Sequence, residues 1–153
     1  MMLGTAIPVL DSSLYIPELK ARTTESVLAQ LVTVVHRAGV VRGAEPLLEL
    51  LRLRERLGTT AIGKGVAVPH ARSLTVDRPA LVVARSHRGV GWDAADGLPA
   101  KLILLVLSPG EWGEEAHHAF LARAVGAVRL QRNRQRLLEA ESFDDVAGVL
   151  REA

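Results

Sequence analysis

The chain contains no cysteine, which excludes a disulfide scaffold, a zinc site with thiolate ligands and a cysteine nucleophile. Aromatic residues make up only 3% of its 153 residues, too few for the stacking platforms that bind single-stranded nucleic acids. The longest apolar run, Leu102 to Leu107, is far shorter than the roughly 20 residues of a membrane span. Together with an N-terminus unlike a signal peptide, these absences favour a cytoplasmic protein without direct membrane insertion.

Neither sign of charge is in clear excess, since 19 Lys and Arg against 17 Asp and Glu leave a net charge of +2. The densest basic stretch, residues 129–136, has no aromatic residue beside it. We interpret it as a solvated helix face and expect no nucleic-acid partner. The length and the 48% hydrophobic content predict a single domain over residues 1–153, with an irregular lead over about residues 1–15.

Hydrophobic periodicity predicts helices at both ends of the chain. Near the N-terminus, apolar residues at three- and four-residue steps predict one helix from Thr23 or Thr24 to Gly39 and a second from Ala44 to Gly58. Three further helices are expected: from about Gly113, around Gln135 to Ala140, and from Ser142 or Asp144 to Leu150.

The middle of the chain predicts strands. The strand candidates are Val66–Val68, Leu81–Ala84 and Leu102–Leu107. The last is apolar on both faces, as expected of a central strand covered by helices, and a polar turn is predicted over residues 92–99. Strands between groups of helices predict one α/β domain.

The segment Gly58–Gly65 matches the Gly-x4-Gly-Lys part of a nucleotide-binding P-loop. That motif requires Ser or Thr after the lysine and runs from a strand into a helix. Here Gly65 takes the hydroxyl position, a predicted helix precedes the loop and a strand follows it. We interpret Gly63 and Gly65 instead as positions whose backbone angles, or close neighbours, exclude a Cβ.

His70 is the candidate nucleophile. It follows Pro69 at the end of a predicted strand, where α/β sheets open their ligand crevices. Imidazole, with an unperturbed pKa of about 6.5, is a good nucleophile near neutral pH, and proline fixes φ on one side of it. The hypothesis is a histidine that carries a covalent group; the alternative is a structural histidine at a strand end.

Other candidate residues lie before and after His70 in the chain. His117 and His118 fall in the first turns of a predicted helix, where the positive end of the dipole favours an anion, and periodicity does not choose between them. A zinc site with His70 is an alternative, although adjacent helix residues point about 100° apart. Arg54 is either part of a solvated helix face or turns its guanidinium toward a phosphate beside His70.

The residues from Arg54 to His70, RERLGTTAIGKGVAVPH, resemble the signature of the enzyme IIA domains of the sugar phosphotransferase system, of fructose, mannitol and nitrogen-regulatory type. The resemblance continues in residues 16–19, 91–99 and 104–109 and in the terminal helices. Ala61 stands where the family usually has glycine, and Val68 replaces isoleucine. The resemblance implies a mixed β-sheet flanked by helices on both faces.

The same resemblance implies roles for individual residues. In that family the histidine of the signature, here His70, accepts a phosphoryl group from a small histidine-containing phosphocarrier protein and passes it to a cysteine of an enzyme IIB domain. A second histidine hydrogen-bonds the phosphoryl group, and its spacing from the preceding strand selects His118. The family's arginine falls on Arg54 and its Ser/Thr-Thr pair on Thr59 and Thr60, so Arg54 and Thr60 are expected to bind phosphate.

No metal and no cofactor is required by this scheme. A second hypothesis is a regulatory module, in which phosphorylation of His70 switches affinity for another protein without onward transfer. A third, a metal-dependent hydrolase built on the histidines, lacks a carboxylate placed as an obvious general base.

Overall fold

The computed structural model describes residues 10–152, so most of the predicted lead lies outside the described residues. Within residues 10–152 the chain forms a six-stranded sheet and five α-helices, with a 3-10 turn η1 (Ser12–Leu14) near the start. The strands are β1 (Tyr15–Ile16), β2 (Ala61–Gly63), β3 (Val66–Ala67), β4 (His70–Ser73), β5 (Ala80–Val90) and β6 (Ala100–Pro109). The helices are α1 (Thr24–Arg37), α2 (Ala44–Leu57), α3 (Glu114–Arg129), α4 (Gln131–Glu139) and α5 (Phe143–Glu152).

The sheet is mixed, as predicted, and is organised around β6. On one side β6 pairs antiparallel with β5, and β1 then pairs parallel with β5 at the edge. On the other side β6 pairs parallel with β3 and then with β4, while β2 pairs antiparallel with β3. A break between β3 and β4 therefore falls in the middle of this side of the sheet.

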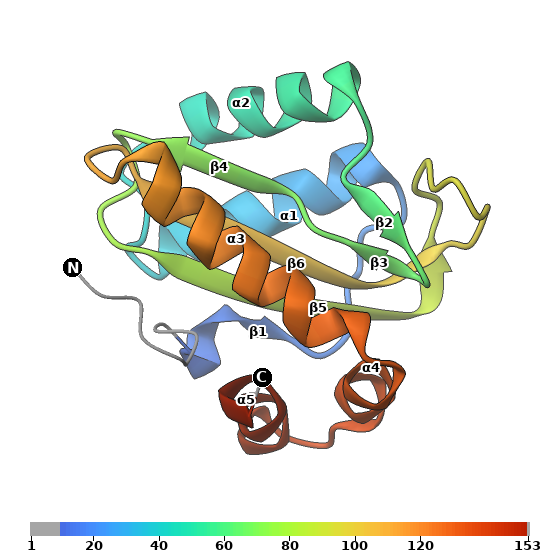
Figure 1. Ribbon diagram of the computed structural model, residues 1–153. Helices are drawn as coiled ribbons and strands as arrows, with labels where there is room; N and C mark the ends of the chain where they lie inside the picture. The colour runs from blue at the N-terminus through green and yellow to red at the C-terminus, as the bar shows by residue number, and fades with distance from the viewer. Residues whose placement is uncertain (1–9, 153) are drawn as a thin grey trace.

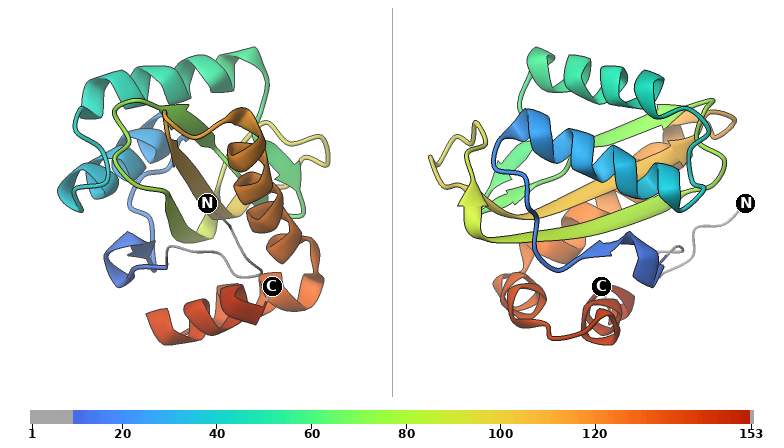
Figure 2. Two further views of the ribbon diagram at one scale, coloured as in Figure 1. Left: turned by 60° about the vertical axis from the view of Figure 1, so that its left-hand side comes forward. Right: turned by 180° about the vertical axis from the view of Figure 1, so that it is seen from behind.

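Helices cover both faces of the sheet (Figures 1 and 2). The odd-numbered residues of β6 from Ile103 to Leu107 pack in one core with α1 and α2. The even-numbered residues from Leu102 to Val106 pack in a second core with α3, α4 and α5. This alternation explains why the sequence of β6 is apolar throughout, and it confirms the predicted helices on both faces.

The predicted helices are present with small shifts at their ends. Thr23 caps α1 as predicted, since its side-chain oxygen accepts the Ser26 N–H at 3.1 Å. The fourth helix begins at Gln131, earlier than expected. The strands β5 and β6 are longer than predicted, and the two- to four-residue strands β1, β2 and β4 were not predicted.

Two predictions about irregular segments need correction. The described end of the lead is ordered: η1 and Tyr15 of β1 lie within residues 10–15, and Leu14 is buried. The turn over residues 92–99 is largely exposed, but its first residue, Trp92, is buried in the core between the sheet and α1 and α2. In both places a few apolar side chains pack onto the sheet and fix a segment whose other residues are polar.

The β2–β3 hairpin confirms the interpretation of its glycines. Gly63 and Gly65 have φ of +84° and +78°, which a side chain rarely tolerates, and Lys64 between them has φ of 59°. The Lys64 N–H donates to Asp96 Oδ2 at 2.8 Å, which ties this turn to the loop before β6. Because the segment is a β-hairpin entered from a helix, it is not a P-loop.

Candidate functional site

His70 is the first residue of β4, close enough to Arg54 and Glu55 of α2 for their charges to act on its ring, and its ring lies beside that of His117 on α3. The backbone of Val68 and Pro69 separates β3 from β4, but the Pro69 carbonyl still accepts the Val106 N–H at 3.0 Å. His70 pairs in register with Val106, whose side chain belongs to the α3 side of the sheet. The half-buried imidazole is thus held at a break between two strands.

The two nitrogens of the His70 ring are not equivalent. Nδ1 lies 3.0 Å from the Val68 carbonyl oxygen, which can only accept, so Nδ1 carries the proton and donates it. Nε2 then holds the lone pair. The pKa of His70 is lowered, mainly by burial and further by Arg54, while the Val68 hydrogen bond and Glu55 act in the opposite direction. A neutral, oriented imidazole with Nε2 as its nucleophilic nitrogen results.

His117 is the second imidazole of the site. It lies on α3, is only 7% exposed, and its ring centroid is 5.8 Å from that of His70. Its Nδ1 lies 2.7 Å from the hydroxyl of buried Ser108, at the end of β6. Burial lowers the pKa of His117 to about 4, helped by its neighbours His70, His118 and Arg72. His117 is therefore a neutral group at neutral pH.

His118, which the spacing selected, is exposed on α3, with its ring centroid 5.9 Å from that of His117. The structure thus brings the rings of His70 and His117 together, while His118 is exposed but close enough for its charge to lower the pKa of His70. The buried stripe of α3 runs through Phe120 and Ala124, three and seven residues after His117, while Leu121 is only partly buried. A stripe drawn through Phe120 would have selected His117 from the sequence.

Glu55, the residue after Arg54 on α2, connects three segments of the chain. Its carboxylate accepts hydrogen bonds from the Thr60 N–H at 2.7 Å, the Thr60 hydroxyl at 2.6 Å and the Trp92 indole N–H at 3.1 Å. The Thr60 carbonyl in turn accepts the Val68 N–H at 2.9 Å. This chain of hydrogen bonds fixes the backbone that holds the His70 ring.

Thr60 itself is buried, and its hydroxyl donates to Glu55. Binding of phosphate by that hydroxyl, as the sequence predicts, would require it to leave Glu55. Thr59 is exposed, and its oxygen accepts the Ala61 N–H at 3.1 Å, so its own hydroxyl proton is available for another acceptor.

Two arginines bring positive charge to the site. Arg54, at the end of α2, donates to the Gly58 carbonyl at 2.7 Å and lies close enough to His70 to lower its pKa. Arg72, two residues after His70 and on the same face of β4, was not predicted. Its guanidinium donates to the Trp112 carbonyl at 2.7 Å, and its charge contributes to the low pKa of His117.

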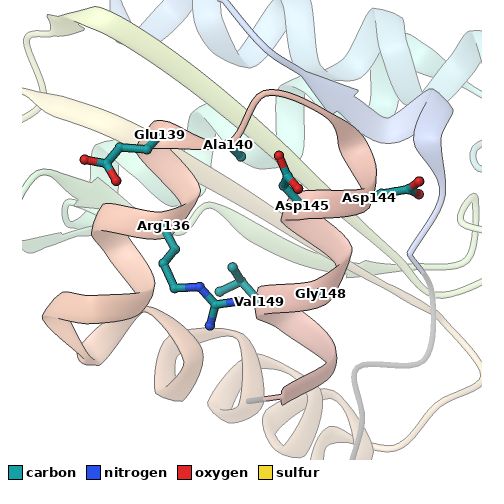
Figure 3. A pocket seen from close by; sticks show the side chains of 7 residues that line it. All are labelled: Arg136, Glu139, Ala140, Asp144, Asp145, Gly148 and Val149. Carbon is teal, nitrogen blue, oxygen red and sulfur yellow. The ribbon is translucent and has the colours of Figure 1, made fainter.

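A separate hollow of about 330 Å³ lies between α4 and α5, at the other side of the sheet from α2 (Figures 1 and 3). Its charged lining residues are Arg136, Glu139, Asp144 and Asp145, and Arg136 is paired with Glu152 at 2.7 Å. Three carboxylates make it a poor site for a phosphoryl group. In residues 10–152 there is no group of three metal-ligating side chains that could hold a metal ion, and no helix long and apolar enough to cross a membrane.

The low pKa of His117 predicts a loss of stability in acid. A histidine held neutral stabilises the fold fully above about pH 6.5, and this stability is lost as the pH falls toward 4, because the unfolded chain takes up the proton first. The loss from this group is about 3 kcal/mol. Urea unfolding between pH 7 and pH 4 should show a much smaller loss in His117→Asn than in the wild type, whereas His118→Asn should retain most of the wild-type loss, because burial is the main cause of the low pKa. The same pH dependence in His117→Asn as in the wild type would contradict the assignment.

The fold and the site together define an α/β domain whose candidate functional group is a neutral histidine beside a second histidine and an arginine. The chain belongs to the family described as "Phosphoenolpyruvate-dependent sugar phosphotransferase system, EIIA 2", whose sequence model matches residues 8–153. Proteins of this family are phosphotransfer components, and the relatives of this chain include both sugar-specific and nitrogen-regulatory proteins.

Two relatives of similar length represent these two branches. The chain is 36% identical over 130 residues to the fructose-specific EIIA component of Haloferax volcanii, covering 85% of this chain and 84% of the relative. It is 31% identical over 137 residues to a nitrogen regulatory protein of Bradyrhizobium diazoefficiens, covering 88% and 87%. It is also 32% identical to part of the fructose-specific EIIABC component of Bacillus subtilis, but spans only 21% of that longer protein.

Solved structures share the fold. The nitrogen regulatory protein IIA-Ntr from Neisseria meningitidis superposes with a TM-score of 0.85 at 27% identity, covering 93% of this chain and 96% of that one. A complex of enzyme IIAMTL with phosphorylated enzyme IIBMTL from Escherichia coli gives a TM-score of 0.79 at 21% identity, covering 94% and 98%.

Proposed function

We propose that the protein is a phosphoryl carrier that accepts a phosphoryl group on Nε2 of His70 from a histidine-containing phosphocarrier protein and passes it to a cysteine of an enzyme IIB domain. The observation that carries the proposal is the bond from Nδ1 of His70 to the Val68 carbonyl, which leaves Nε2 as the nucleophile. The choice of donor follows the resemblance of the signature. The choice of acceptor follows the IIA–IIB complex whose fold this chain shares.

Each transfer is a substitution at phosphorus. In the first, the lone pair of Nε2 forms the new P–N bond while the bond to the donor's nitrogen breaks and its electron pair returns to the donor. Nδ1 keeps its proton, and the Val68 carbonyl stabilises the positive charge that the ring gains. In the second, an acceptor thiolate forms a P–S bond, and the pair returns to Nε2. No metal or cofactor enters either step.

In this proposal His117 takes the role that the family resemblance assigned to His118. In this proposal the Ser108 hydroxyl donates to Nδ1 of His117. The proton of the neutral His117 ring then lies on Nε2, and this N–H donates to a phosphoryl oxygen. The 5.8 Å between the ring centroids places His117 beside the attacking ring. Arg54 supplies positive charge for the phosphoryl oxygens, as predicted from the sequence, while Thr60 acts through its bonds to Glu55.

Reconstitution from purified parts tests the proposal. The chain is first labelled with phosphoryl groups from phosphoenolpyruvate through enzyme I and the phosphocarrier protein, then separated and mixed with an enzyme IIB domain. Movement of the label to the IIB cysteine is expected. Label that forms on the chain but passes to no IIB domain would favour the second candidate, a regulatory module, which the nitrogen-regulatory relatives support. Absence of label would contradict both.

The lowered pKa of His70 predicts the pH dependence of acceptance. Only the neutral ring attacks. As the pH is lowered from 7, the rate of phosphoryl acceptance should therefore remain constant past pH 6.5, the ordinary pKa of histidine, and fall only when the pH reaches the lower pKa of His70. Arg54→Ala removes a charge that lowers this pKa. The fall in rate at low pH, the acid limb of the pH–rate profile, should therefore move to higher pH, whether or not the maximal rate changes. The control Arg56→Ala removes an exposed arginine of the same helix and should leave the limb in place. An unmoved limb in Arg54→Ala would contradict the electrostatic role.

A further inference from the structure

The outer face of α2 carries a stripe of exposed leucines. Along this helix, which lies on the outside of the molecule (Figure 1), Leu50, Leu53 and Leu57 are 39%, 53% and 81% exposed. With exposed Pro46 they follow each other at intervals of four, three and four residues. This is the spacing of the apolar seam of a coiled coil, and a contiguous exposed apolar stripe marks an interaction surface.

The helix is anchored by its other side, so the stripe is free to meet a partner. Leu47, Leu48 and Leu51 are buried in the core that α2 shares with α1 and the sheet. Exposed Glu49 and Arg56 flank the seam at equivalent coiled-coil positions, and neither forms an ion pair or side-chain hydrogen bond within residues 10–152.

Charge along α2 changes sign from one end to the other. The acidic residues Glu45 and Glu49 lie in its first half, and the arginines Arg52, Arg54 and Arg56 lie in its second half. Glu55, the one acidic residue of the second half, is turned inward and bound to Thr60 and Trp92. Of the arginines, Arg52 already pairs with Glu25 of α1 at 2.8 Å. A helix with this pattern is complementary to a copy of itself that runs in the opposite direction.

We propose that two copies of the protein associate through α2, packed antiparallel about a two-fold axis. The heptad spacing then sets Leu50 against Leu53 of the partner subunit, and Leu57 against Pro46 of the partner subunit. Glu49 faces Arg56 of the partner subunit, and the axis repeats this ion pair. A parallel pair would instead set Glu49 against Arg54 of the partner subunit, whose guanidinium already donates to the Gly58 carbonyl, and would leave Arg56 without an opposite charge.

A contact between two single helices is small and belongs to the weak, transient class, with a Kd between roughly 1 μM and 1 mM. Covalent trapping is therefore the appropriate test, and the chain suits it because it has no cysteine. Leu50→Cys and Leu53→Cys each introduce one thiol, and a size tag on one variant distinguishes the possible disulfide-linked dimers. Under mild oxidation of an equal mixture, the tagged–untagged dimer is expected to form at least several-fold faster than either homodimer.

The control is Leu98→Cys, which places a thiol at a leucine of similar exposure, 49%, in the loop before β6. It gives the rate of random collision. Homodimers that form faster than the mixed dimer would indicate a parallel pair, and a mixed dimer no faster than this control would indicate no association. Either result overturns the proposal.

Charge reversal provides an independent test. In the background of the two cysteine variants, Glu49→Arg alone or Arg56→Glu alone should lower the yield of mixed dimer by about tenfold. The double reversal E49R/R56E should restore it, with circular dichroism unchanged throughout. Yields unaffected by the single reversals would overturn the proposal. A third outcome would also overturn it: no disulfide-linked dimer forms, but Leu53→Asp loses phosphoryl acceptance. That result would mean that the α2 stripe binds the donor protein.

Discussion

Replacing His70 by alanine is expected to abolish phosphoryl acceptance, lowering its rate by at least about 10⁴-fold, because no other group supplies the attacking lone pair. The measurement is labelling of the chain by phosphoenolpyruvate, enzyme I and the phosphocarrier protein. His36→Ala, which removes an exposed histidine on α1, should label like the wild type. Acid-labile label at the wild-type level in His70→Ala would place the phosphoryl group elsewhere.

His70→Asn separates the nucleophile from the local structure. Its side-chain N–H can still donate to the Val68 carbonyl, as Nδ1 of the histidine does, but it has no nucleophilic nitrogen. We expect this variant to fold with the stability of the wild type at neutral pH and to accept no label. Recovery of acceptance in His70→Asn would show that the imidazole of His70 is not the carrier.

The second large effect is expected at His117. His117→Ala should slow acceptance by about 10²- to 10³-fold, the usual cost of removing one preorganised donor to a developing oxyanion. His118→Ala should change the rate by less than about threefold, because the ring of His118 is exposed and acts on His70 only as a minor charge. The two variants form a matched pair on one helix, and melting curves establish that both are folded.

The reverse ranking would restore the assignment made from sequence spacing. A large loss in His118→Ala with a wild-type rate in His117→Ala would mean that α3 presents its second histidine when the donor docks. Equal, small losses would leave Arg54 as the main group that stabilises the phosphoryl oxygens.

The helices and the central strands could be predicted from the sequence because each has enough residues to show a period. The apolar face of α1 repeats at three- and four-residue steps, and β6 is apolar throughout because both its faces are covered. The position of His70 followed from the proline before it and from the family signature. Its half-buried place beside α2 and α3 is in keeping with the proposed site.

The rest depends on contacts between distant residues, which a sequence pattern does not contain. The strand β4 is only four residues long and exists because β6 pairs with it. The role of Glu55 depends on Trp92, which is 37 residues later and donates its indole N–H to the carboxylate. The alternating charges along α2 have the pattern of a solvated helix face. Only the folded structure shows that Glu55 is turned inward and bound to Thr60 and Trp92.

The sequence pattern does not separate His117 from His118 for a related reason. Both lie within one turn of Leu121, so a stripe drawn through that residue includes either of them. In the structure Phe120 is fully buried and Leu121 is not, which rotates the buried face of α3 toward His117. Ser108, at the end of β6, then completes the environment of that ring.

The site of phosphorylation on the ring tests the account most directly. Nuclear magnetic resonance of the phosphorylated chain, labelled with ¹⁵N in its histidines, identifies the nitrogen that is bonded to phosphorus through its ¹⁵N–³¹P coupling. The account predicts coupling to Nε2 of His70, with the proton retained on Nδ1. A phosphoryl group on Nδ1 of His70, or on either histidine of α3, would contradict it.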